Sequence, residues 1–412
     1  MTDTTQHAAR EADAARGYPL VVHILFVGIF IVGWAEMSIV GILPDIAASY
    51  GVSSTDLGVV ISLYSLSFAI VGPAVLVLVR GLSPRVMLAS LMAVIAVTSL
   101  ASAMTDDVVA MSSWRMALAA ASAAFAGTTM SVAVRLVPPQ NRGRVLGYIA
   151  AGFGGSLVGG VPLTILISDF GGWRLSMELI AAAAVLVTLA LWFAWPAAAR
   201  AKAEHAPMRT AAIRALPASH MIAQASMFLW MLAYAVPFTF LPSILRESLG
   251  YSAVELTIAM VLFGCCCVAG AQLGGMVSDR LGELRTITLA FSAHAAILLA
   301  APFLTQSFPG VLLTMAAWGL ASWMSTPPLQ AQIAKTSGDI SDLMLTLSNS
   351  VLHAGIAVGA GLGALLMAQS MSAFFHVPVA ILAVAIVLLW RHQRSHAALA
   401  EAGAAVNRFD RG

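Results

Sequence analysis

Charged residues are scarce in this chain of 412 residues. Asp, Glu, Lys and Arg make up 10% of it, whereas a soluble globular domain carries roughly a quarter. Hydrophobic residues make up 60%, and the mean hydropathy is +0.90. This composition excludes an ordinary water-soluble domain and predicts that lipid is the main solvent of the folded chain.

Cysteine is rare as well, and its placement argues against a metal site. The three residues, Cys265, Cys266 and Cys267, are adjacent in one apolar run. Successive residues of a helix point about 100° apart, so three such thiolates cannot converge on one tetrahedral metal ion. We therefore interpret them as small packing residues and expect no metal.

Motifs for nucleotide binding and for hydrolysis are missing. The chain contains no G-x-x-x-x-G-K-[ST] sequence, and its serines lie in no G-x-S-x-G setting. The run from Gly152 to Gly160 has Leu157 where the third glycine of G-x-G-x-x-G would stand, and it lies within an apolar run. We expect no cofactor, no enzymatic activity and no ATP-driven pump.

Apolar runs make up most of the sequence, and each has the length of about 20 residues that spans a hydrocarbon core. They are continuous rather than alternating, which favours helices over the strands of a barrel. The first run has no small-residue cleavage site, so it is predicted to be retained rather than removed as a signal peptide. The predicted spans cover residues 20–43, 55–79, 84–104, 108–134, 144–168, 173–196, 218–245, 254–278, 285–306, 309–333, 342–369 and 372–391.

Positive charge gathers in alternate gaps between the runs. All but three of the 21 Lys and Arg residues fall in the terminal segments and in every second gap. This is the positive-inside pattern of a multi-pass membrane protein, and it predicts a bacterial-type cytoplasmic membrane with both termini in the cytoplasm. Because topology explains the basic residues, we expect no nucleic-acid partner. The three exceptions are Arg115, Arg174 and Arg246.

The two halves of the chain repeat one another. Residues 43–46, Leu-Pro-Asp-Ile, recur at 241–244 as Leu-Pro-Ser-Ile, and Arg80 corresponds to Arg280. A six-helix unit duplicated in one orientation is typical of a two-bundle transporter with its site between the bundles. We predict an all-α membrane protein of twelve transmembrane helices in two pseudo-symmetric six-helix bundles. The predicted parts are a cytoplasmic tail (1–19), a first bundle (20–196), a cytoplasmic linker (197–217), a second bundle (218–391) and a cytoplasmic tail (392–412).

One loop carries a family motif, Gly275-Met276-Val277-Ser278-Asp279-Arg280-Leu281-Gly282. This segment matches the G-x-x-x-D-R-x-G loop of the major facilitator superfamily. The chain resembles that superfamily over essentially its whole length. The resemblance implies a gating role for Asp279 and Arg280. In the first half of the chain, the corresponding residues 75–80 lack both the Gly and the Asp of this motif.

Other segments resemble one branch of the superfamily, the drug:proton antiporters of the sugar, nucleoside and drug efflux permease type. They are Glu36 with Leu43-Pro44, Arg135-Leu136-Val137-Pro138-Pro139, Gly160-Val161-Pro162, Gly172-Trp173-Arg174, Trp318-Gly319 and Pro327-Pro328-Leu329-Gln330.

Glu36 and Arg115 are candidates for proton coupling. Ionisable groups within membrane spans are costly to bury and are functional candidates by default. Each lies seven residues from the same predicted surface, so at 1.5 Å per residue both lie roughly 10 Å below it. A carboxylic acid that moves between a dry site and a cavity near a cation binds and releases a proton, as proton-coupled exchange requires. The alternative is that Glu36 and Arg115 form a structural ion pair that joins their two helices.

Further candidates are polar and aromatic residues that are predicted to contact a substrate. Asn349 and His353 are spaced i, i+4 on one helix face, and a histidine changes its charge at about pH 6.5. The alternatives are hydrogen bonding between helices for this pair and lipid-facing positions for the aromatic residues. The predicted set is Trp34, Tyr64, Trp230, Tyr234, Gln330, Asn349 and His353.

Glycines recur at four-residue spacing in three of the predicted helices. Such faces let helices approach closely. In the superfamily the fifth and eighth helices meet across the bundles, as do the second and eleventh, so the resemblance implies sliding surfaces between the bundles. Lipid-exposed packing defects are the alternative. The residues are Gly155, Gly159 and Pro162, then Gly270 and Gly274, then Gly355, Gly359 and Gly363.

These features predict a secondary active transporter of the cell inner membrane. The leading hypothesis is proton-coupled efflux, by antiport, of a small organic compound such as a drug, sugar or nucleoside, through alternating access. A proton-coupled importer or a uniporter on the same fold is the alternative, and an intramembrane enzyme is a remote one. The predicted partners are the substrate, protons and the lipid bilayer, with no obligate protein partner.

Overall fold

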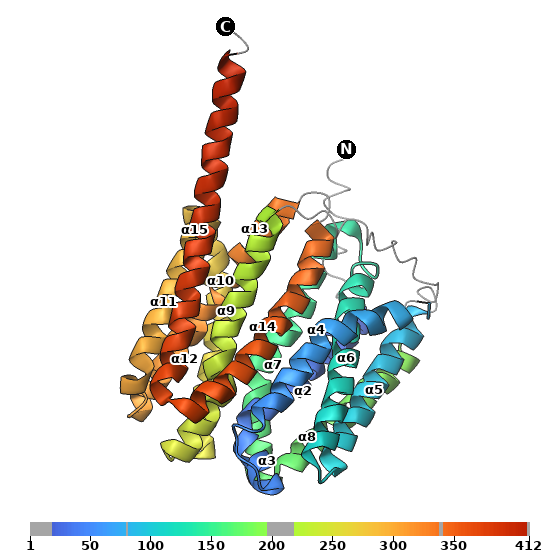
Figure 1. Cartoon of the computed structure of the whole chain (residues 1–412). Helices are drawn as coiled ribbons and strands as arrows, with labels where there is room; N and C mark the ends of the chain where they lie inside the picture. The colour runs from blue at the N-terminus through green and yellow to red at the C-terminus, as the bar shows by residue number, and fades with distance from the viewer. Residues whose placement is uncertain (1–18, 80, 196–217, 338–340, 410–412) are drawn as a thin grey trace, which may run out of the picture.

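The chain is helical throughout the part that the computed structural model describes, which is residues 19–79, 81–195, 218–337 and 341–409 (Figure 1). Eleven of its helices are long and apolar enough to span a membrane. No strand occurs among these described residues. The architecture therefore agrees with the predicted all-α membrane protein.

The first bundle holds six of these spans. Short connections join them, so successive helices run antiparallel. Its elements are α2 (Leu20–Gly41), α3 (Leu43–Tyr50), α4 (Gly58–Val79), α5 (Pro84–Met104), α6 (Val108–Ala133), η1 (Pro139–Asn141), α7 (Arg142–Gly171) and α8 (Trp173–Phe193).

The second bundle repeats this arrangement. It contains five spans that are continuous helices and one that is divided. Its elements are α9 (Ala218–Ser243), the π-helical turn η4 (Ile244–Ser248), α10 (Ala253–Leu281), α11 (Glu283–Leu304), α12 (Phe308–Trp323), α13 (Thr326–Ser337), α14 (Ser341–Gln369) and α15 (Met371–Phe409).

The divided span consists of α12 and α13. α12 has 16 residues, or about 24 Å, which is too short for a hydrocarbon core of roughly 30 Å. α13 continues it after a break at Met324 and Ser325. Pro327 and Pro328 account for the break, since proline donates no backbone N–H and disfavours a helical residue before it. The fold is thus twelve crossings in two bundles, although the sequence predicts one continuous helix over 309–333.

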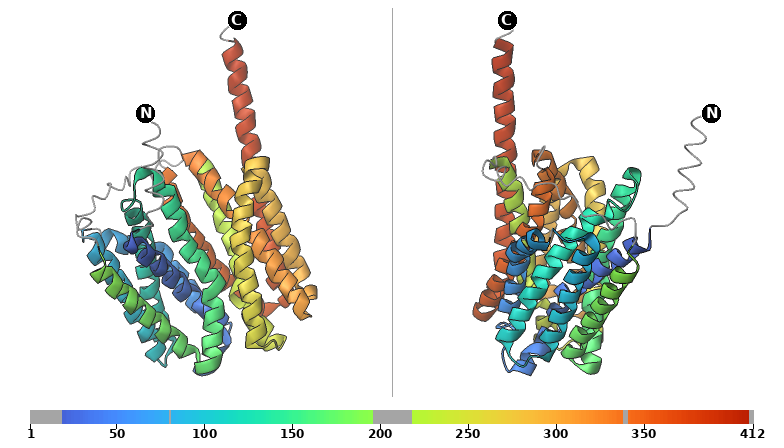
Figure 2. Two further views of the ribbon diagram at one scale, coloured as in Figure 1. Left: turned by 180° about the vertical axis from the view of Figure 1, so that it is seen from behind. Right: turned by 90° about the vertical axis from the view of Figure 1, so that its right-hand side faces the viewer.

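The two ends of the molecule are marked by α3 and by the C-terminal end of α15, which lie opposite one another (Figures 1 and 2). We term them the α3 end and the far end. Because successive helices are antiparallel, α7 begins and α10 ends at the far end. The predicted linker 197–217 lies outside the described residues, as does nearly all of the predicted tail 1–19. α15 remains helical to Phe409, beyond the predicted end of its span at 391.

Large apolar side chains cover much of the outer surface. Leu78, Phe170, Phe193 and Phe303 are each more than three-quarters exposed. Water would not favour this exposure, whereas lipid does. The outer surface therefore suits a bilayer.

Most of the packing across the bundles comes from two pairs of helices, α4 with α14 and α7 with α10. Gly58 of α4 lies against Ala364 of α14, where a Cβ atom on the glycine would be 3.0 Å from the alanine methyl group. A Cβ atom on Gly264 of α10 would collide with the backbone of Leu157 in α7. Glycine at these positions lets the two backbones approach closely.

The predicted glycines lie elsewhere, so the prediction that they form the surface between the bundles is wrong for this structure. Four-residue spacing identifies a face for close packing, but the arrangement of helices decides which neighbour fills it. Each predicted glycine packs within its own bundle, and Pro162 is buried in α7. Gly155 and Gly159 face Phe30; Gly270 and Gly274 face Leu320 and Met324; Gly355, Gly359 and Gly363 face Phe228, Leu232 and Val236.

Gly264→Ala tests the close approach of α7 and α10. The added methyl group would meet the backbone of Leu157, so we expect a loss of about 1–3 kcal/mol in the free energy of unfolding. Thermal unfolding in detergent would measure it. Gly275→Ala, in the same helix, is the matched control, because a Cβ atom there would meet nothing within 4 Å. Equal melting temperatures for the two variants would contradict the tight contact.

Candidate functional site

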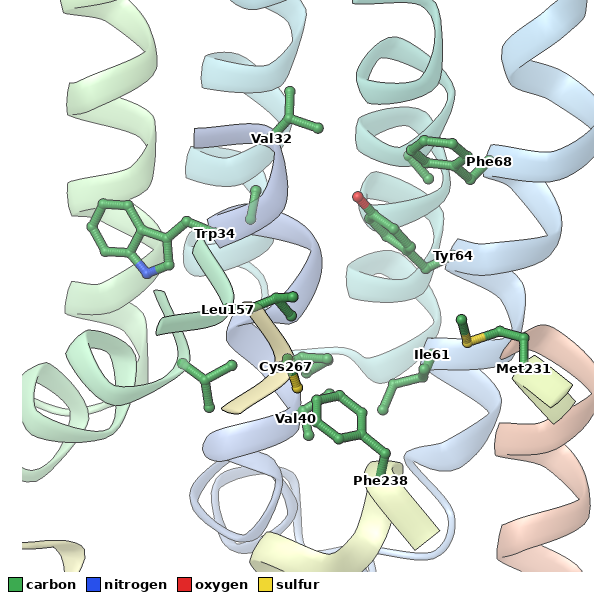
Figure 3. Packing of buried hydrophobic residues seen from close by; sticks show 14 of the residues in the cluster. Val32, Trp34, Val40, Ile61, Tyr64, Phe68, Leu157, Met231, Phe238 and Cys267 are labelled. Carbon is green, nitrogen blue, oxygen red and sulfur yellow. The ribbon is translucent and has the colours of Figure 1, made fainter. Parts of the chain in front are cut away.

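A small cavity of about 30 Å³ lies between the two bundles. This volume has room for about one or two water molecules. Most of its wall is apolar, and Figure 3 shows Val40, Ile61, Tyr64 and Phe238, which reach it from three helices. The polar residues of the wall are Glu36, Tyr64, Ser65, Arg115, Tyr234 and Thr239.

The carboxylate of Glu36 forms a hydrogen bond between the bundles. Its Oε1 lies 3.2 Å from Nε2 of His353 in α14, and both side chains are buried. The ring of Phe68 stacks on the imidazole, with 3.6 Å between ring centroids. Oε2 of Glu36 has no hydrogen-bond partner among the described residues. The carboxylate therefore joins α2 to α14 and keeps one oxygen available.

The second nitrogen of His353 determines how many protons this pair holds. Nδ1 lies 2.9 Å from the carbonyl oxygen of Asn349, one helical turn earlier. A carbonyl oxygen only accepts hydrogen bonds, so Nδ1 carries a hydrogen. Nε2 of His353 and Oε1 of Glu36 then share one further proton, held either by the carboxylic acid or by the imidazolium. Without that proton the neutral imidazole has one hydrogen for two acceptors, so it keeps either the bond to Asn349 or the bond to Glu36 and loses the other.

Arg115 of α6 faces the same cavity but does not bind the carboxylate of Glu36. Its Nη2 donates to the backbone carbonyl oxygens of Ala35 (3.2 Å) and Glu36 (3.4 Å). The guanidinium carbon lies 5.0 Å from the centre of the Tyr64 ring, in a cation–π contact. Nε has no hydrogen-bond partner within the described part of the chain. The two residues thus share a cavity without forming an ion pair through their side chains.

An aromatic cluster forms part of the second bundle's wall. Tyr234 lines the cavity and packs against Phe238 and Trp318, with ring centroids 4.9 Å and 5.5 Å away. Trp230 is buried but packs edge-on against Trp323 and does not line the cavity. Of the predicted aromatic residues, Tyr64 and Tyr234 are therefore the two that reach it.

Three other predicted substrate residues also lie away from the cavity wall. Trp34 donates a hydrogen bond from Nε1 to the hydroxyl of Thr164, at 2.8 Å, within the first bundle. Gln330 is exposed on α13. Asn349 is exposed one turn from His353, to which it offers its backbone carbonyl.

Phe68 and Phe238 belong to the site, but they are not among the site residues predicted from the sequence. Phe68 follows Tyr64 by four residues, and Phe238 follows Tyr234 by four, so each shares a helix face with a predicted residue. That spacing is the signal that would have found them.

The three cysteines point in different directions. Cys265 is exposed, Cys266 is partly buried and Cys267 is buried, as expected for consecutive residues of a helix. Within the described ranges, no group of three or more His, Cys, Asp or Glu side chains is placed to hold a metal ion.

Polar contacts between the bundles close the α3 end. Arg246 of η4 lies 3.0 Å from Asp45 of α3, which also accepts a hydrogen bond of 2.8 Å from Ser168. Ser54 donates to the carboxylate of Glu247 at 2.8 Å. The pairing with Asp45 explains why Arg246 departs from the alternating charge pattern.

α7 and α10 are apart at the far end. They cross at Leu157 and Gly264, and continuing their antiparallel register places Gly147 opposite Gly274. A Cβ atom on Gly147 would meet nothing within 4 Å, and one on Gly274 would meet Met324 of its own bundle. The bundles are thus joined at the α3 end and separate along these helices at the far end.

The predicted gating residues Asp279 and Arg280 are exposed at the far end. Asp279 lines a hollow of about 440 Å³ together with Glu283 and Lys335, which are hydrogen-bonded to each other. No ion pair of Asp279 occurs within the described residues.

Comparison with known proteins identifies the family. The sequence profile of the Major Facilitator Superfamily matches residues 25–341 and 225–409. The chain belongs to this superfamily. It is therefore a multi-pass membrane transporter and not an enzyme.

Relatives and solved structures agree with this assignment. The inner membrane transport protein YdhP of Escherichia coli (strain K12) is 28% identical over 88% of this chain and 92% of that protein. A chloramphenicol resistance protein of Streptomyces lividans is 28% identical over 64% of this chain and 67% of that protein. A bacterial homolog of the human lysosomal transporter Spinster, inward-facing and occupied, has a TM-score of 0.73 at 15% identity, covering 91% of this chain and 96% of that one. A D-xylose-proton symporter has a TM-score of 0.71 at 14% identity, covering 90% and 96%.

Asp45→Asn removes one charge of the pair that closes the α3 end. A partly exposed ion pair contributes up to about 1 kcal/mol, so we expect the population open at this end to rise up to about fivefold. Spin labels at Ala48 and Ser248, read by pulsed electron resonance, would report the distance between the bundles. Asp106→Asn is the matched control, because Asp106 pairs with Arg174 within the first bundle. An equal response to both substitutions would contradict this closing role.

Proposed function

We propose that this protein is a proton-coupled exporter that exchanges protons for a small organic compound by alternating access. The observation that carries the proposal is the hydrogen bond between Glu36 of the first bundle and His353 of the second, because His353 bonds both to Glu36 and to Asn349 only when the pair holds a shared proton. The superfamily membership supports the transport of a small molecule.

Proton binding is linked to the arrangement of the bundles, because His353 keeps both of its hydrogen bonds only when the pair holds its proton. Loss of the proton weakens the contact between α2 and α14 and favours a different arrangement of the bundles. A compound that donates a hydrogen bond to Glu36 competes with the proton and with His353. Proton and compound therefore bind in turn, which is the requirement for antiport.

The membrane supplies the driving force for this exchange. One charge that crosses 100 mV is worth about 2.3 kcal/mol. That free energy shifts an equilibrium between two states by about fiftyfold. A single proton is thus sufficient to drive a useful concentration gradient.

We also propose that the far end faces the cytoplasm. Arg142, Arg280 and Arg285 lie at this end, and the positive-inside rule places such residues in the cytoplasm. In that orientation the protein is open toward the cytoplasm, where an exporter loads its substrate.

Efflux is supported by the chloramphenicol resistance protein among the relatives. Uptake is the second candidate, because the D-xylose-proton symporter shares the fold. The same carboxylate would drive uptake if substrate and proton bound together rather than in turn. The direction of substrate flux relative to an imposed proton gradient distinguishes export from uptake.

Glu36→Gln tests proton coupling. The amide still donates a hydrogen bond to His353 but cannot titrate, so we expect flux driven by a pH gradient to collapse while gradient-free counterflow partly survives. Proteoliposomes would be loaded with a compound from an efflux screen that begins with chloramphenicol. Glu178→Gln, an exposed position on α8, is the matched control and should retain gradient-driven flux. Normal gradient-driven flux in Glu36→Gln would exclude Glu36 as the proton carrier.

We further propose that Asp279 meets the start of α7 when the far end closes. Asp279 lies 15 residues beyond Gly264, and Arg142 lies 15 residues before Leu157, at which the two helices cross. At 1.5 Å per residue both are about 22 Å from the crossing. Arg142 and Arg144 are exposed and opposite in charge to Asp279, which supports an ion pair in the closed state.

A charge exchange tests this pair. We expect Asp279→Lys to lower the rate of transport about tenfold, because like charges would oppose closure of the far end. Arg142→Asp introduced into that variant should restore most of the rate. Transport by the single and double variants in proteoliposomes is the measurement, and no recovery in the double variant would exclude the pairing.

A further inference from the structure

We propose that the cavity between the bundles selects compounds without net charge that offer both a hydrogen-bond donor and an acceptor, and that it rejects organic cations. This inference rests on the proposed function, in which this cavity of about 30 Å³ enlarges as the bundles move apart and then holds the transported compound. It follows from the charges, the unpartnered atoms and the apolar wall of the site.

The charged groups of the cavity balance one another. Two of the residues that line the cavity, Glu36 and Arg115, have a carboxylate or a basic side chain. His353 lies next to them and is hydrogen-bonded to Glu36. The remaining titratable groups of the wall are the phenols of Tyr64 and Tyr234. In the state that has released the shared proton and binds the compound, Glu36 is ionised, His353 is neutral and the net charge is zero. An uncharged compound preserves that balance, whereas an ion leaves an uncompensated charge in a buried site.

The positive charge of Arg115 acts directly on the cavity. Its contacts are the backbone carbonyl oxygens of Ala35 and Glu36, the sulfur of Met177 and the ring of Tyr64, none of which carries a full negative charge. The residue is only 2% exposed, so water does not screen it. Arg115 therefore repels the same cation that Glu36 would attract.

Two unpartnered atoms define what a bound compound must offer. Oε2 of Glu36 accepts a hydrogen bond and Nε of Arg115 donates one, and both atoms are buried. A buried polar atom that has no hydrogen-bond partner raises the free energy of the protein. A compound with one donor and one acceptor, such as an alcohol or an amide, satisfies both atoms.

The remainder of the wall suits an apolar body. Ile39, Val40, Ile61, Phe238 and Ile356 contribute aliphatic and aromatic surface. Such surface binds an apolar group by removing it from water. The inferred ligands are therefore small, uncharged and amphipathic.

A pair of probes with the same shape tests the charge rule. Choline and 3,3-dimethylbutan-1-ol carry the same hydroxyl group and differ by the positive charge at the quaternary centre. Titration calorimetry on the full chain in lipid nanodiscs would measure their affinities without any gradient. We expect the alcohol to bind at least about tenfold more tightly than choline, because Arg115 opposes the cation. Choline that binds as tightly as the alcohol, or more tightly, would overturn the proposal.

Substitution of Arg115 should reverse this preference. In Arg115→Met the charge of Glu36 is no longer opposed, and we expect choline to bind at least about tenfold more tightly than in the native protein. Adding Glu36→Gln should remove that gain. Arg174→Met, whose side chain lies outside the cavity at the α3 end, is the matched control and should leave both affinities unchanged. Unchanged choline affinity in Arg115→Met would overturn the proposal.

The two probes decide the question even if Arg115→Met does not fold, because the native protein alone shows which probe it prefers. The outcome is also separable from that of proton coupling. Binding is measured without a gradient, so normal gradient-driven flux in Glu36→Gln would overturn the coupling and leave the charge rule intact. A native protein that prefers choline but exports against protons would overturn the charge rule alone.

Discussion

The poor solvation of charge inside the helix bundles is the constraint on which the rest of the structure depends. Lipid cannot solvate a charge, so every buried ionisable group must find its partners within the protein. Glu36 finds one on the opposite bundle, at His353, and Arg115 finds the backbone carbonyl oxygens of α2. Each keeps one atom without a partner, and both residues line the same cavity. The polar groups of the two halves therefore gather where the bundles meet.

Duplication of the six-helix unit places this cavity between the bundles. α4 packs on α14 and α7 packs on α10 at corresponding positions, and both pairs run antiparallel. Polar contacts join the bundles at the α3 end, while Gly147 faces open space toward the far end. A site between two such surfaces can open to one side at a time, as alternating access requires. The fold therefore supplies the geometry of transport, and a few buried side chains supply its chemistry.

The two halves share a fold but differ in charge. Asp45 pairs with Arg246 across the α3 end, whereas Ser243 occupies the position of the second half that corresponds to Asp45. The loop with Asp279 has no acidic counterpart in residues 75–80 of the first half. Duplication thus provides two similar scaffolds, and substitutions within each scaffold provide the polar contacts that distinguish the two ends.

Much of the architecture is readable in the sequence, because lipid imposes a length and a polarity on every span. The twelve crossings, the two halves and the buried positions of Glu36 and Arg115 all follow from hydropathy and charge. The partner of Glu36 does not, since His353 lies 317 positions away and the rotation of each helix decides which faces meet. The glycines show the same limit, because their spacing marks a face for close packing without naming the helix that fills it. Topology comes from local hydrophobicity, whereas the site comes from the packing of helices distant in the chain.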